Sequence, residues 1–258
     1  MKLTSSLSLL LLGSITSSVS ATTYFIDFND ADTSGTSSVT WNTYGDPADL
    51  VSSNTLLDET GSTSSIYITA TGNIDDSFGT NLSNPSTRPA WLSEFAADDF
   101  FWTGNDSDNN EVLSFTTTFG GLTSGDIVSL DVFAARTSSL VLEANYEYSL
   151  DGGTTWYGFE VVENDGTAAT TDGWDSNTTQ TALFNLDEDG GYEDGRYMNV
   201  SDVTLISSTL DVKVTVPVEA NYAGINAMQL TVIPEPASFA IITGLLPFGF
   251  LALRRRRQ

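Results

Sequence analysis

Short runs rich in β-branched and aromatic residues recur along most of this chain, and clusters of Gly, Asn, Asp and Ser separate them. Residues 23–28 and 126–135 alternate apolar and polar side chains with the period of a strand that has one buried face. Further strands are expected at residues 38–41, 50–57, 65–71, 111–119, 141–150, 155–163, 180–186, 210–216 and 223–232. Helical periodicity is nearly absent, with one short helix expected at residues 90–97. Short strands joined by glycine-rich turns predict a single all-β domain, a β-sandwich.

The N-terminus carries the three parts of an export signal. Lys2 supplies a positive charge, residues 7–15 are apolar, and Val19, Ser20 and Ala21 form a small-residue cleavage site. The apolar run is too short to span a bilayer comfortably. We therefore expect residues 1–21 to be a signal peptide that is removed after Ala21, and we expect export of the protein.

The last 26 residues, 233–258, follow a second three-part order. A proline-flanked motif comes first, an uncharged run covers residues 237–253, and an arginine cluster closes the chain. The motif is Pro234, Glu235 and Pro236, and the cluster is Arg254, Arg255, Arg256 and Arg257. The uncharged run would span about 25 Å as a helix, and flanking arginines can extend to cover the rest of a ~30 Å hydrocarbon core. We expect a transmembrane helix that keeps its arginines on the cytoplasmic side.

This order resembles the PEP-CTERM sorting signal of Gram-negative bacteria, over about a tenth of the chain. The resemblance implies that an exosortase, a membrane-embedded cysteine peptidase, recognises the Pro-Glu-Pro motif and removes the tail. The precursor would then be anchored transiently in the inner membrane, and the ectodomain (residues 22–232) would reach the cell surface or extracellular matrix. Composition alone leaves open an ordinary C-terminal anchor, in which the prolines only stop the chain before the helix.

The charge of the chain is strongly acidic, with 34 Asp and Glu against 9 Lys and Arg. Glu235 and five of the basic residues lie in the two terminal signals. The segment between the signals therefore keeps 33 acidic and 4 basic residues, a net charge near −29. Such a surface repels nucleic acid and anionic lipid, and it could attract Ca²⁺. A generic acidic exported protein is the alternative interpretation.

The chain has neither cysteine nor histidine. An exported domain without disulfides depends on its hydrophobic core alone. The absence of both residue types excludes Ser-His-Asp and Cys-His catalysis and every histidine-ligated metal site. A pair of carboxylates of the kind that glycosidases use remains open.

Residues 149–156 read SLDGGTTW and match the Asp-box pattern at five positions. The matching residues are Ser149, Asp151, Gly153, Thr155 and Trp156. In such a turn the Asp and Ser side chains accept backbone N–H bonds, the glycine takes a positive φ, and the tryptophan packs beneath. Asp-boxes recur in sialidase propellers, but this chain has one copy and is too short for six blades. We interpret the motif as a structural hairpin.

One acidic segment has the beginning of a calcium loop. Asp106, Asp108 and Asn110 alternate, as do the first oxygen ligands of such loops. The glycine and the glutamate that an EF-hand needs further on are missing, because Glu111 and Thr117 occupy those positions. The alternative is a solvated turn, so no cofactor is expected apart from this Ca²⁺ hypothesis.

Exposed aromatic faces can stack on sugar rings. Trp174 lies among small polar residues with little apolar company, and it is the first candidate for such a platform. Trp91 and Tyr44 follow it. For each of the three, the alternative is a loop anchor that folds back onto the sandwich.

Two segments resemble exported domains with a galactose-binding-like jelly roll. They are FTTTFGGLTSGDIVSLDVFAAR (residues 115–136) and YAGINAMQL (residues 222–230), which look like a strand-turn-strand unit and a closing strand. The resemblance implies a jelly-roll-like fold and a tendency towards carbohydrate binding, without a fixed set of ligand residues.

These observations together predict an exported, non-catalytic protein of the cell surface or matrix, with a structural or interaction role and extracellular polysaccharide as its partner. Two alternatives stay open. One is a carbohydrate-active enzyme that uses two carboxylates, and the other is an adhesin that Ca²⁺ stabilises.

Overall fold

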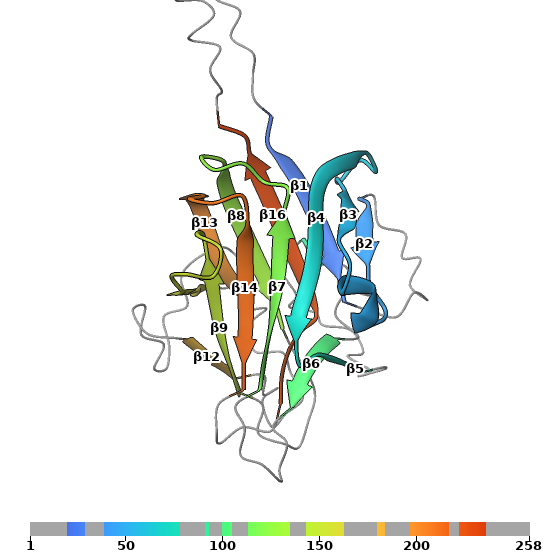
Figure 1. Cartoon of the computed structure of the whole chain (residues 1–258), viewed down its shortest axis with the longest axis vertical. Helices are drawn as coiled ribbons and strands as arrows, with labels where there is room; N and C mark the ends of the chain where they lie inside the picture. Colours follow the sequence, from blue (N-terminus) through green and yellow to red (C-terminus); the bar gives the residue numbers. More distant parts are fainter. Residues whose placement is uncertain are drawn as a thin grey trace, which may run out of the picture.

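The computed structural model describes residues 20–28, 39–77, 91–92, 100–104, 113–134, 143–162, 180–183, 197–216 and 222–235. These ranges are mostly β-strand, and two sheets lie one behind the other in Figure 1. We call the rear sheet, which contains β1 and β16, sheet A, and the front sheet, which contains β7 and β14, sheet B. The expected all-β class and the sandwich of sheets are confirmed.

Each large sheet has a defined strand order. Sheet A runs β11 (Glu160–Val162), β13 (Tyr197–Thr204), β8 (Ile127–Phe133), β16 (Ala227–Ile233), β1 (Thr22–Asp27) and β2 (Trp41–Thr43). Sheet B runs β10 (Tyr157–Gly158), β9 (Glu143–Ser149), β14 (Leu210–Thr215), β7 (Ser114–Gly120), β4 (Thr63–Gly72) and β3 (Asn54–Leu57), and β12 (Gln180–Leu183) also pairs with β9. The small sheet C runs β15 (Tyr222–Ile225), β6 (Phe100–Gly104) and β5 (Asp75–Ser77), and a 3-10 turn, η1, covers Pro47–Leu50.

The first and last strands of the sandwich are neighbours. β1 pairs antiparallel with β16, and Thr22 lies opposite Val232. β16 also pairs with β8, where Ile233 lies opposite Ile127. The start of β1 and the end of β16 therefore lie at the same end of sheet A, at the top of Figure 1.

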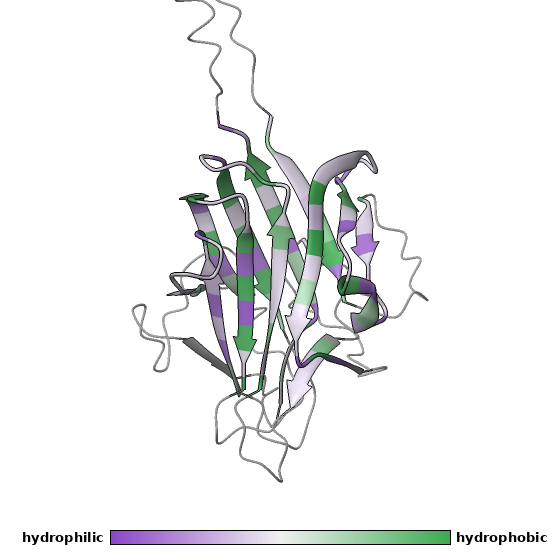
Figure 2. Cartoon of the chain, in the orientation of Figure 1, coloured by the Kyte–Doolittle hydropathy of each residue, from purple (hydrophilic) through white to green (hydrophobic). Residues whose placement is uncertain are grey.

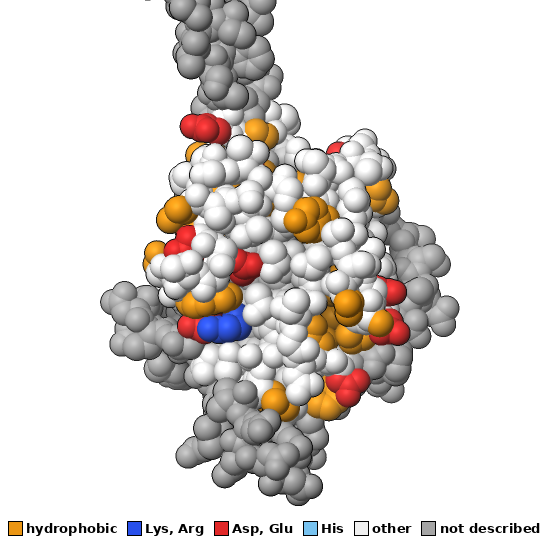
Figure 3. All heavy atoms as spheres, viewed as in Figure 1, with side chains coloured by type: hydrophobic (Ala, Val, Ile, Leu, Met, Phe, Trp, Pro, Cys, Tyr) orange, Lys and Arg blue, Asp and Glu red, His pale blue; other side chains and the backbone are white. Residues whose placement is uncertain are grey.

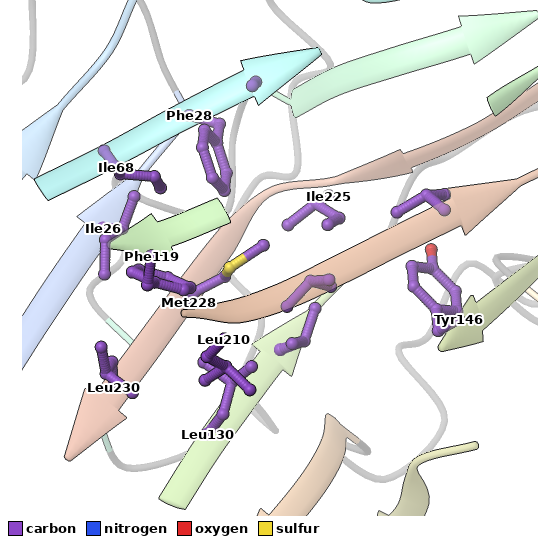
Figure 4. Packing of buried hydrophobic residues seen from close by; sticks show 14 of the residues in the cluster. Ile26, Phe28, Ile68, Phe119, Leu130, Tyr146, Leu210, Ile225, Met228 and Leu230 are labelled. Atoms are coloured by element: carbon purple, nitrogen blue, oxygen red, sulfur yellow. The ribbon is translucent and has the colours of Figure 1, made fainter. Parts of the chain in front are cut away.

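The core lies between the two sheets and follows the alternation of the strands. In β8 and in most of β4, every second residue is buried, and the stripes of Figure 2 show this period. Sheet A contributes Ile26, Leu130, Met228 and Leu230, and sheet B contributes Ile68, Phe119, Tyr146 and Leu210 (Figure 4). Burying each of these large apolar side chains contributes roughly 1.5–3 kcal/mol. This repeated burial, rather than any covalent link, holds the cysteine-free domain together.

Strand β13 is absent from the expectations because its pattern is broken. Met198 and Val200 face the core, but the pairing with β8 shifts register between Val200 and Val203. Asp202 sits at this bulge with φ 53°, a left-handed conformation that Asp tolerates better than most residues. The extra residue interrupts the two-residue period on which the prediction of strands depends.

Several expected elements have different bounds or positions. The strand expected at residues 50–57 is shorter, because η1 occupies Pro47–Leu50 and β3 begins at Asn54. Strands β5 and β6 were not expected. Of the helix expected at residues 90–97, only Trp91 and Leu92 are described, and they form a turn and a bend.

The terminal signals lie almost wholly outside the described ranges. Among the described residues, no helix is long and apolar enough to cross a membrane. The span expected at residues 237–253 and the first 19 residues of the expected signal peptide are not described.

Candidate functional site

A row of side chains crosses the outer face of sheet A, on the side away from the core. The row runs from Asn199 on β13 to Asp131 on β8, Gln229 on β16, Phe25 on β1 and Trp41 on β2. Each member lies directly opposite the next, so neighbours are about 4.8 Å apart across the sheet. We call these five residues the central row. Its three polar side chains lie on three adjacent strands, and its last two members, Phe25 and Trp41, are aromatic.

The polar part of the row contains a hydrogen-bonded carboxylate. The amide Nδ2 of Asn199 donates to Oδ1 of Asp131 at 2.5 Å. Burial raises the pKa of Asp131 to about 6, and the bond from Asn199 opposes the rise. A carboxylate held away from water, with a raised pKa, is typical of functional sites as well as of buried networks.

An aromatic cluster lies beside the central row. Trp41, Trp91 and Tyr197 pack against a buried group made of Leu92, Phe133 and Ala227. The rings of Trp91 and Tyr197 meet edge to face, with centroids 6.2 Å apart. Trp41 also contacts Phe25 of the central row, at 5.1 Å between centroids. The cluster thus joins the row at its β2 end and extends towards β13.

Three polar atoms of this face are buried and have no hydrogen-bond partner within the part of the chain that the structure describes. They are the indole Nε1 of Trp41, the indole Nε1 of Trp91 and Oε1 of Gln229. A buried polar atom without a partner costs about 1–3 kcal/mol, so each such atom in a native protein needs an explanation. The two indoles can only donate and the amide oxygen can only accept. The face therefore offers both kinds of hydrogen bond next to aromatic rings.

The three predicted platform residues have different outcomes. Trp91 belongs to the aromatic cluster. Tyr44 is 8% exposed and packs in the core, where burial raises its pKa to about 12, so its ring offers no open face for stacking. Trp174 lies outside the described residues.

Six residues of the central row and the aromatic cluster were not predicted as site residues: Phe25, Trp41, Asp131, Tyr197, Asn199 and Gln229. For Phe25, Asp131 and Gln229, the alternating positions within expected strands indicated which face each side chain occupies. The register that aligns them across strands is set by long-range pairing, which one sequence does not reveal. Asn199 also lies on the strand that was missed.

The Asp-box residues form the expected hairpin between β9 and β10. Oγ of Ser149 accepts from the amide of Gly153 at 2.9 Å, and Gly153 has φ 81°. Oδ1 of Asp151 accepts from the amide of Thr155 at 2.8 Å, and these hydrogen bonds lower the pKa of Asp151. The motif belongs to the β9–β10 end of sheet B, on the opposite layer from the central row.

The outer face of sheet B carries one basic residue. Lys213 on β14 lies 2.5 Å from Glu147 on β9, and its Nζ stands 4.2 Å from the ring centroid of Trp156. In Figure 3 the blue side chain touches red and orange neighbours on a largely uncharged surface. Lys213 is the only Lys or Arg in the ranges that the structure covers. Its charge is therefore already paired.

The remaining predicted sites are mostly outside the described ranges. Asp106, Asp108 and Asn110 are among those residues, and so are Pro236 and the arginines 254–257. Within the ranges listed above, no three acidic residues gather as metal ligands. Ala21, Pro234 and Glu235 are described and exposed.

Comparisons with known proteins give no family. No protein-family model and no curated protein matches the chain. Among solved structures, the carbohydrate-binding module TmCBM61 in complex with β-1,4-galactotriose is 14% identical with a TM-score of 0.28, over 63% of this chain and 86% of that one. An F5/8 type C domain of Bacteroides fragilis is 9% identical with a TM-score of 0.25, over 63% and 90%. The enzymatically active domain of tailspike protein 4 from bacteriophage CBA120 is 12% identical with a TM-score of 0.30, over 64% and 19%. TM-scores this low carry no argument about ligand or activity.

Proposed function

We propose that this protein is an exported, non-catalytic surface or matrix protein that binds carbohydrate through the outer face of sheet A. The observation that carries this proposal is the central row beside the aromatic cluster. Trp41, Trp91 and Gln229 on this face each have a buried hydrogen-bonding atom without a partner among the described residues. The amphipathic chemistry of a saccharide matches this arrangement.

A sugar ring has two kinds of surface. Its C–H groups are weakly polar and pack on aromatic faces, while its hydroxyls both donate and accept hydrogen bonds. Ligand sites in proteins combine apolar and aromatic walls with a few placed polar groups. Here Gln229 and Asp131 can accept from hydroxyls, and the two indoles can donate to them. The bonds to Gln229 and to the two indoles would each satisfy an atom that otherwise carries a desolvation cost.

The order of the strands supports a jelly roll as the finer description of the sandwich. The four strands β1, β16, β8 and β13 are adjacent in sheet A, and β7, β14, β9 and β10 are adjacent in sheet B. Along the chain, β7 is followed by β8 of sheet A, β14 is followed by β15 of sheet C and then by β16 of sheet A, and β3 and β4 extend sheet B at one edge. Interleaving of this kind is how double-sheet jelly rolls are connected.

Export and PEP-CTERM sorting rest on the terminal segments, and the geometry of the domain is compatible with them. The signal peptide would end at Ala21 and the sorting motif begins at Pro234. Thr22, the residue after Ala21, lies opposite Val232, which is two residues before Pro234, on paired strands. A precursor with both apolar segments in one membrane would keep the whole sandwich on one side of it. Intact mass of the protein recovered from its host tests both processing events at once.

Binding to a glycan array tests the carbohydrate part. Trp91→Ala and Trp41→Ala should each weaken binding at least tenfold, because each removes a ring and an indole donor. Trp156→Ala is the matched control, since this tryptophan lies in the hairpin of the opposite sheet. The proposal fails if the intact ectodomain binds no glycan, or if Trp156→Ala weakens binding as much as the other two.

A further inference from the structure

Glu235, which lies between the two prolines of the sorting motif, is hydrogen-bonded to the folded domain. The backbone amide of Glu235 donates to Oδ1 of Asp126 at 3.1 Å. Asp126 is buried, and its second oxygen, Oδ2, accepts from the amide of Thr123 at 2.8 Å. One carboxylate therefore ties the turn between β7 and β8 to the chain that leaves β16.

The same turn makes room for the side chain of Glu235. Gly125 has φ 100°, and a Cβ built on it would lie 2.6 Å from Oε2 of Glu235. The turn is fixed in place by the amide of Gly125, which donates to the carbonyl of Leu205 at 2.9 Å. The φ of 100° by itself favours glycine here, and the absent Cβ leaves space that the carboxylate end of Glu235 occupies.

The pairing of β16 continues up to this contact. Ile233 pairs with Ile127 on β8, so no flexible residue separates the last strand pair from the motif. The sequence predicts a stiff, exposed spacer at Pro234 and Glu235. Both residues are exposed, but Glu235 is also held by its backbone amide.

We propose that Asp126 and Gly125 are positioning residues that hold the start of the sorting motif against the domain, so that removal of the tail begins with release of this contact. The inference rests on the tail removal proposed above. A peptidase that binds its substrate as an extended strand needs the backbone N–H groups of that substrate. The N–H of Glu235 becomes available only after its bond to Asp126 breaks. The domain thereby sets how fast its own anchor is removed.

The experiment compares full-length variants in the native host and follows the loss of the tail by pulse-chase and intact mass. Asp126→Ala should be processed about fivefold faster, the factor that corresponds to one net hydrogen bond. Asp126→Asn keeps an acceptor oxygen and should process more slowly than Asp126→Ala. Ser129→Ala is the matched control, because Ser129 accepts a backbone N–H from Asp202 within the same sheet, away from the motif. It should be processed at the wild-type rate.

Hydrogen exchange of the Glu235 amide gives a second readout that needs no peptidase. Asp126→Ala should raise this exchange rate about fivefold while the amides of β16 stay protected. Equal exchange in wild type and variant, or equal or slower processing of Asp126→Ala, overturns the inference. If wild type is never processed, the proposed tail removal is wrong, and the exchange rate alone decides whether the contact exists.

Discussion

The side chain of Asn42 bridges the edges of the two sheets, because it forms with the backbone of Leu57 the two hydrogen bonds that a neighbouring strand would form. Its Oδ1 accepts from the amide of Leu57 at 2.8 Å, and its Nδ2 donates to the carbonyl of Leu57 at 2.9 Å and to that of Phe25 at 3.0 Å. Asn42 lies on β2 of sheet A, and Leu57 lies on β3 of sheet B. One side-chain amide thus continues the hydrogen bonding from one edge strand to the other.

Asn42→Ala should lower the free energy of unfolding by about 2–3 kcal/mol, because it leaves buried backbone groups of both sheets without partners. Urea denaturation followed by tryptophan fluorescence measures the loss. Asn54→Ala serves as the control, since the side-chain amide of Asn54 makes exposed local bonds, and it should change stability by less than about 0.5 kcal/mol. A similar loss in both variants would contradict the role of Asn42.

Asp131→Asn should stabilise the domain at neutral pH. Burial raises the pKa of Asp131 to about 6 in the folded state, from 3.8. A raised pKa means that the stability contributed by the protonated form is present below pH ~4 and lost as pH rises to about 6. Because Asn stays neutral, the free energy of unfolding of the variant should exceed that of the wild type by up to about 3 kcal/mol at pH 7. Near pH 3.5 the two free energies of unfolding should be equal.

Thermal unfolding of both proteins between pH 3.5 and 7.5 measures this difference. If the difference in melting temperature between the variant and the wild type does not widen as pH rises, the pKa of Asp131 is not raised. Because Asp131 belongs to the central row, the same substitution should weaken carbohydrate binding while it raises stability. That opposition is expected where a residue is kept for function rather than for folding.

Gly121→Ala should destabilise the domain far more than Gly152→Ala. Both glycines have positive φ, 77° and 73°, and alanine in that conformation costs about 1 kcal/mol. A Cβ at Gly121 would also lie 2.2 Å from the backbone oxygen of Ser65, whereas at Gly152 the nearest atom is 3.7 Å away. We expect a loss above about 3 kcal/mol for Gly121→Ala and about 1 kcal/mol for the other. Equal losses by chemical denaturation would mean that the turn relaxes freely.

Tyr146→Phe should cost about 1–2 kcal/mol without changing the strand content. The hydroxyl of Tyr146 is fully buried and donates to the carbonyl of Gly224 at 2.6 Å, which links β9 to β15. The substitution keeps the ring and leaves that carbonyl without its donor. Tyr157→Phe is the control, because Tyr157 is 42% exposed. If the control loses as much stability, the hydrogen bond to Gly224 contributes nothing specific.

The sequence was sufficient for those parts of the fold that depend on local pattern. Strands were expected at residues 126–135 and 210–216, and β8 (Ile127–Phe133) and β14 (Leu210–Thr215) lie within these ranges. The Asp-box turn was also predictable, because its bonds join residues at most four positions apart. Strand β13 was not, because the bulge at Asp202 shifts its pattern by one residue.

The candidate site was predictable only in type. Aromatic side chains on a β-sandwich suggested a sugar platform, and Trp91 is part of the face that we propose. For Tyr44 the alternative applies, because the residue folds back into the core as a loop anchor, and its polar sequence neighbours did not decide between the two interpretations. The meeting of Asp131, Gln229 and Trp41 depends on pairings between strands that are far apart in the chain. Such contacts are fixed by topology, which no short window of sequence contains.

The adjacency of β1 and β16 also decides how the domain bears mechanical load. Any tether attached after Ile233 pulls along the axis of β16, and a polymer gripped on sheet A pulls against it. β16 forms six residue pairs with β1 and seven with β8. Their backbone hydrogen bonds are then loaded together in shear, instead of opening one after another.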